Sequence, residues 1–86
     1  LFDAMETEQD FIKYAKIITP SGIESVASMP VGGANQQPIT LSVIKKLKLI
    51  TVGDGLYKLQ NKNGATAMSA NGYAFVIDLK AMANAQ

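Results

Sequence analysis

The side chains of this chain that could do chemistry are seven carboxylates, eight lysines and the serine and threonine hydroxyls. The chain contains no Cys and no His, and all of its cations are Lys. The usual zinc, iron and copper sites and the Cys–His and Ser–His nucleophile pairs therefore cannot be built from these residues. We expect no metal and no cofactor.

Three carboxylates lie in or near predicted loops or strand ends, namely Glu24, Asp54 and Asp78. Asp54 stands between two glycines, which is typical of a tight turn. Asp78 falls on the polar side of a predicted strand, where it can pair with Lys80 or with a residue of a neighbouring strand. A Ser or Thr here would have only a Lys or a carboxylate to activate it, so no nucleophile with its base can be assembled. We predict that the chain is not an enzyme and takes no small-molecule substrate.

Composition predicts a single small domain over residues 1–86. Apolar residues make up 48% of the chain and charged residues 17%, which is typical of a globular protein and not of a disordered one. At this size a chain buries only about 60 to 65% of its unfolded surface, so the core is modest. No segment approaches the run of apolar residues that spans a bilayer. Because the chain begins at Leu1 and not at Met, we expect a fragment or processed form of a longer chain.

The first part of the chain is predicted to be helical. Apolar residues recur at helical spacing from Asp3 to Ile18, and the two candidate N-caps, Asp3 and Thr7, each have an acidic residue three positions later. A second, short helix is expected in "TPSGIESVASMP", with Thr19 or Ser21 as its cap and the closing Pro as its limit. "PVGGANQQP", Pro30 to Pro38, is predicted to be an exposed loop because of its Gly, Asn and Pro content.

The second part is predicted to pass from a helix into a sheet. Thr40 can cap a helix that buries one apolar face. The glycines of "VGDG", Val52 to Gly55, indicate a turn, and "LYKLQ" after it is a strand. After a polar loop, "YAFVIDLK" alternates strictly, which predicts a strand with one buried face. The apolar residues of that helix are Leu41, Ile44 and Leu47, and those of the last strand are Tyr73, Phe75, Ile77 and Leu79.

Together these elements predict an α+β fold, in which an N-terminal helix and short helices pack on a small antiparallel sheet. The last strand should lie at the centre of that sheet. Four large side chains in strict alternation cannot all remain in water without forming an exposed apolar patch.

The segment from Thr40 to Met82 resembles the headpieces of type IV pilins and pseudopilins, in which a short helix precedes a strand, a polar loop and a second strand. The Arg-free composition, rich in Ala, Asn, Gln and Ser, also suits a secreted surface. The resemblance implies a structural subunit that assembles with other protein subunits or with its own copies. It implies an extracellular or periplasmic location, with a membrane anchor if an N-terminal helix is missing. The chain lacks the hydrophobic N-terminal helix and the C-terminal Cys pair of that family.

An alternative resemblance is to winged-helix DNA-binding domains. "GIESVASM" would be the second helix, "PITLSVIKKLKLI" the recognition helix and "ITVGDGLYKL" the wing. The would-be phosphate contacts are Lys45, Lys46, Lys48 and Lys58. A net charge of only +1 and the absence of Arg favour the structural module over this alternative. We expect nucleic acid as a partner only under the DNA-binding hypothesis.

Overall fold

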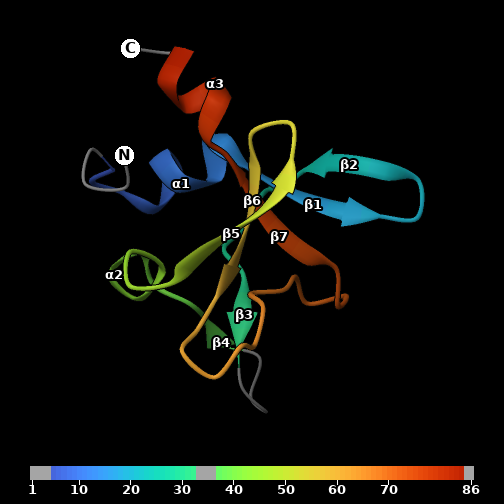
Figure 1. Ribbon diagram of the computed structural model, residues 1–86. Helices are drawn as coiled ribbons and strands as arrows, with labels where there is room; N and C mark the ends of the chain where they lie inside the picture. Colours follow the sequence, from blue (N-terminus) through green and yellow to red (C-terminus); the bar gives the residue numbers. More distant parts are fainter. Residues whose placement is uncertain (1–4, 33–36, 85–86) are drawn as a thin grey trace.

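The computed structural model describes residues 5–32 and 37–84, which form an antiparallel sheet with short helices on one face (Figure 1). The sheet has five strands in the order β2-β1-β7-β6-β5, and β3 and β4 form a separate ladder. The predicted α+β class with an antiparallel sheet is confirmed. In chain order the elements are α1 (Glu8–Tyr14), β1 (Ala15–Thr19), β2 (Gly22–Ser25), β3 (Val31–Gly32), β4 (Gln37–Pro38), α2 (Leu41–Ile44), β5 (Lys48–Gly53), β6 (Leu56–Gln60), β7 (Ala74–Asp78) and α3 (Leu79–Asn84).

Strand β7 is the central strand, as predicted, and it pairs with β1 on one side and β6 on the other. Phe75 and Ile77 are buried on the face that the helices cover. The strand ends earlier than expected, because Asp78 Oδ1 accepts a hydrogen bond from the Ala81 N–H at 2.9 Å and α3 begins at Leu79. Val76, on the opposite face, is also fully buried.

The core lies between the sheet and the three helices found in the described residues. The ring of Phe11, from α1, stacks on that of Phe75 with their centroids 6.3 Å apart and an angle of 18° between the ring planes. Helix α2 buries Leu41 and Ile44, and α3 buries Met82. Each helix is too short to be stable alone, so burial of these side chains, and not helix propensity, holds it in place.

Helix α1 is shorter than the predicted helix from Asp3 to Ile18. Its start is as expected: Thr7 is the N-cap, and a capping box with Asp10 is present. The other candidate cap, Asp3, lies outside the described residues. The helix ends at Tyr14, and Ala15–Thr19 forms β1. The β-branched side chains of this segment suit a strand, and pairing on both sides with β2 and β7 outweighs the local helical pattern.

The second predicted helix, in residues 19–30, is absent, and β2 forms a hairpin with β1 instead. Thr19 pairs with Gly22 across the turn, and Gly22 has a φ of +123°, which other residues rarely adopt. The Thr19 hydroxyl holds this turn: it accepts from the Ser21 N–H at 3.1 Å and donates to the Gly22 carbonyl at 2.9 Å. Thr19 and Ser21 therefore organise a turn, where the sequence suggested helix caps.

The loop predicted from Pro30 to Pro38 forms a short ladder at both of its ends instead, although Gly32, Gln37 and Pro38 are exposed as predicted. Val31 pairs with Pro38 and Gly32 with Gln37, and Pro30 itself is buried. The Ile39 N–H donates to the Pro30 carbonyl at 2.8 Å, which extends the pairing by one step. Residues 33–36 of this predicted loop lie outside the described residues.

Helix α2 is a single turn, so the predicted short helix, which was expected to include Leu47, is wrong beyond Ile44, and β5 begins at Lys48. Thr40 is its N-cap but makes no side-chain capping hydrogen bond. The turn at Val52 to Gly55 is confirmed, since β5 and β6 form a hairpin around it. Both central residues of that turn have positive φ, 56° at Asp54 and 78° at Gly55, which is the geometry that joins twisted strands well.

Candidate interaction surface and apolar pocket

The face of the sheet opposite the helices carries a row of apolar side chains; we call this side of the sheet the outer face. Ile23 lies opposite Ile18, Ile18 opposite Ala74, and Ala74 opposite Met68. Residues directly opposite in antiparallel strands project from the same face and touch. These four residues are the apolar row. Ile23 is 52% exposed, Met68 42% and Ile18 36%, so the row faces solvent.

Two lysines border the apolar row on the outer face. Lys58 lies opposite Val76, and Val76 lies opposite Lys16, so one lysine stands on each side of this valine. Val76 is fully buried although no helix of the described residues covers this face, and we attribute its burial to the aliphatic stems of the two half-buried lysines. The Lys16 ammonium donates to Ser25 Oγ at 3.2 Å.

The lysines of the DNA-binding alternative do not share one element. Lys48 and Lys58 are diagonal neighbours on the outer face, because Lys48 pairs with Gln60 and Lys58 with Ile50. Lys45 and Lys46 lie instead in the exposed turn between α2 and β5. The hairpin in the position of the wing is present, but the helix pair that this alternative requires is not found in residues 5–32 and 37–84.

The three carboxylates named in the sequence analysis, Glu24, Asp54 and Asp78, stabilise turns and a helix start. Glu24 Oε2 accepts from the Thr19 hydroxyl at 3.0 Å, Asp54 occupies a tight turn, and Asp78 caps α3. Asp10 has a lowered pKa, because its carboxylate accepts hydrogen bonds from the backbone N–H groups of Glu6 and Thr7. Within the described part of the chain, no three acidic, Cys or His side chains come together as a metal site would require.

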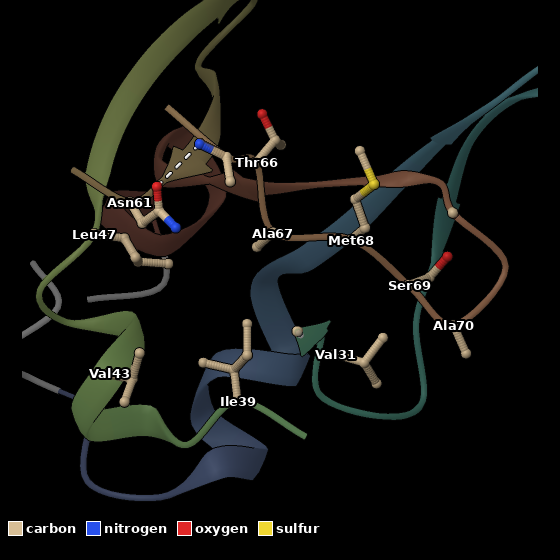
Figure 2. Close-up of a pocket in the computed structure, with 13 residues that line it drawn as sticks. Val31, Ile39, Val43, Leu47, Asn61, Thr66, Ala67, Met68, Ser69 and Ala70 are labelled. Atoms are coloured by element: carbon tan, nitrogen blue, oxygen red, sulfur yellow. Dashed lines mark hydrogen bonds between the residues drawn. The ribbon is translucent and has the colours of Figure 1, made fainter. Parts of the chain in front are cut away.

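A pocket of about 390 Å³ lies between α2 and the segment Ala65–Ala70 (Figure 2). In this view the side chains of Ile39 and Val43 project toward the open space, while the Met68 side chain points away from it. The described residues that line the pocket include no charged side chain; the larger apolar ones are Val31, Ile39, Val43, Leu47 and Met68.

The polar residues of the pocket wall are used to shape the loop. Asn61 Oδ1 accepts from the N–H groups of Asn63 at 2.9 Å and Ala65 at 3.0 Å. Ser69 Oγ accepts from the Tyr73 N–H at 3.1 Å. These bonds fix the course of residues 61–73, and the oxygens that make them are not aimed at a ligand.

Backbone hydrogen bonds at Ala67 join this loop to the sheet, and nothing in the sequence indicated them. Its N–H donates to the Leu59 carbonyl at 2.8 Å, and its carbonyl accepts from the Phe75 N–H at 2.9 Å. Ala67 therefore occupies the place between β6 and β7 where the two strands would otherwise pair directly.

Within the described residues, the outer face and the pocket are surfaces that could contact another molecule. No helix in the described ranges has the length and apolar character needed to cross a membrane. Comparison of the chain with protein-family models, curated proteins and solved structures finds no match.

Proposed function

We propose that this chain is a non-catalytic structural module that associates with other protein subunits through its outer face. The observation that carries the proposal is the apolar row: Ile23, Ile18 and Met68 are in register across the sheet and in contact with water. An antiparallel sheet with one covered face normally presents polar side chains on the other. Contiguous exposed apolar side chains commonly mark an interaction site.

The lysines beside the apolar row would limit which partner surfaces can dock there. Lys16 and Lys58 border the row at fixed register, so a partner that also places lysines there is disfavoured by like charge. The secreted or periplasmic location and the pilin-like character of the subunit rest on the resemblance of Thr40–Met82 and on the composition. The assembly itself rests on the exposed row.

Self-association of the isolated chain tests the proposal. Sedimentation velocity over a wide range of protein concentration should show a mass that rises with concentration for the parent chain. The double variant Ile18→Lys/Ile23→Lys should remain monomeric, because it places charge in the middle of the buried contact.

Val43→Lys is the matched control, since Val43 is 45% exposed but lies on α2 and is not part of the apolar row. It should associate as the parent does. A parent chain that stays monomeric at every concentration, or an equal loss of association in the Val43→Lys control, would contradict assembly through the outer face.

A further inference from the structure

We propose that the pocket between α2 and Ala65–Ala70 binds an uncharged hydrocarbon group, such as the chain of a neutral alcohol or the tail of a fatty acid. This site adjoins the apolar row on which the proposed assembly depends: Met68 belongs to both, whereas Ile18, Ile23 and Ala74 do not line the pocket. Its volume of about 390 Å³ lies within the range of small-molecule sites in proteins. At about 30 Å³ for each non-hydrogen atom, as in liquid water, it holds roughly a dozen such atoms.

The pocket exists because its loop wall is made of small residues. The stretch "GATAMSANG", residues 64–72, offers Ala65, Ala67, Ala70 and Gly72 to the space, and none of these can fill it. The opposite wall, Ile39, Val43 and Leu47, is apolar and larger. Side chains on the two sides therefore leave a gap that an apolar guest can occupy.

The backbone around the pocket is fixed before any ligand arrives. Ala67 is bonded to both β6 and β7, and the Val31 N–H donates to the Met68 carbonyl at 2.8 Å. On the other side, Ile39 packs so closely on Gly32 that a Cβ there would lie 3.3 Å from Ile39 Cδ1. A preformed cavity avoids the cost of ordering its walls on binding.

The electrostatics of the pocket select the kind of ligand. Its described lining carries no charge, and the hydrogen-bonding oxygens of Asn61 and Ser69 already accept from backbone N–H groups. A charged group placed inside would lose its hydration without meeting an opposite charge. Complementarity therefore favours a neutral, apolar group.

Two ligands distinguish a neutral alcohol from a fatty acid as the molecule that supplies the hydrocarbon group. We would titrate the ¹⁵N-labelled chain with 1-decanol and with decanoate, and follow the amide signals. Saturable shifts should concentrate on residues 65–70 and on Val43 with both compounds if the head group stays in solvent. Binding of decanol alone would show that the whole molecule enters the pocket.

Val43→Asp is the test variant, because it places a carboxylate on the pocket wall. It should weaken decanol binding by at least about tenfold. Val52→Asp is its matched control: Val52 is 43% exposed, against 45% for Val43, but does not line the pocket. The control should bind as the parent does. Ala70→Leu, which fills the space from the loop side, should weaken binding independently.

The outer face is the competing site for any apolar compound. Ile23→Lys should leave decanol binding unchanged if the pocket is the site. Shifts that gather on Ile18, Ile23 and Ala74, a loss of binding in Ile23→Lys with none in Val43→Asp, or no saturable binding of either compound would each overturn the proposal.

Discussion

Phe75 is the side chain on which the core depends most, because it is buried on the central strand and stacks on Phe11. Phe75→Ala should lower the free energy of unfolding by about 3 to 5 kcal/mol, the usual range for a core Phe. Since small domains have only about 5 to 15 kcal/mol in total, part of the population should unfold. Urea unfolding measures the loss. Phe75→Leu, which keeps most of the volume, should lose less, and an Ala variant as stable as the parent would remove Phe75 from the core.

Gly55 combines a positive φ with close packing, and these two effects can be separated. At a φ of +78° an added Cβ would lie 2.8 Å from the Lys80 Cβ at the start of α3. Gly64 has a φ of +87° but nothing within 4 Å of that position. Gly64→Ala should therefore cost only the strain of the left-handed conformation, about 1 to 2 kcal/mol. Gly55→Ala should cost more, and equal losses in urea unfolding would show that α3 does not pack against this turn.

Some single residues were predictable and others were not, for a physical reason. The alternation in "YAFVIDLK" identified Phe75 and Ile77 as core residues, because period 2 is a local property of the chain. Tyr73 and Leu79, predicted on the same buried face, are only half-buried, and Leu79 begins α3. Lys16 was missed as a neighbour of Lys58, although both border Val76. Their proximity depends on the register of strands far apart in the sequence, which no local pattern encodes.

The Asp10 carboxylate at the N-terminus of α1 makes the free energy of unfolding depend on pH. The pKa of Asp10 is lowered from its ordinary value of 3.8 by the backbone N–H groups of Glu6 and Thr7. A lowered folded-state pKa gives stability that is complete above about 3.8 and is lost as the pH falls through the folded value. The parent should therefore lose stability in this acidic range. Thermal melts should show a smaller acid-induced loss for Asp10→Asn.

Glu8→Gln is the control for this prediction, because it removes a carboxylate from the same turn without touching the capping box. Its melting temperature should depend on pH as that of the parent does. Identical acid profiles for the parent and Asp10→Asn would show that the Asp10 carboxylate does not stabilise the helix start.

The elements themselves were predicted best where the signal was local. The Thr7 cap, the turn at Asp54 and Gly55, and the strands β6 and β7 were all visible in the sequence. Strands β1 and β2 were not, because their apolar spacing also fits a helix and only pairing with distant β7 decides between them. The pocket was not predictable either, since it results from small loop residues meeting α2.

For the whole molecule, the balance of charge argues against DNA binding. The net charge is +1 and the cations are all Lys, so we expect affinity for duplex DNA weaker than about 10⁻⁴ M at physiological salt. Fluorescence anisotropy with a labelled duplex at low and moderate salt measures it. Micromolar binding that falls steeply with salt, and that is lost in Lys45→Ala/Lys46→Ala but kept in Lys13→Ala/Lys62→Ala, would favour the winged-helix hypothesis instead.

The position of β7 also determines when the chain can fold during its synthesis. Ile18 pairs with Ala74, 56 positions later. The edge of β1 that does not pair with β2 therefore has no partner until the ribosome has made β7. Before that moment the nascent chain can form local pairings such as the β1–β2, β3–β4 and β5–β6 hairpins, and isolated hairpins are marginal in water. Each hairpin also presents an open edge that can pair with other chains. Messages truncated before β7 should therefore yield aggregation-prone polypeptides that quality-control proteases and chaperones must remove.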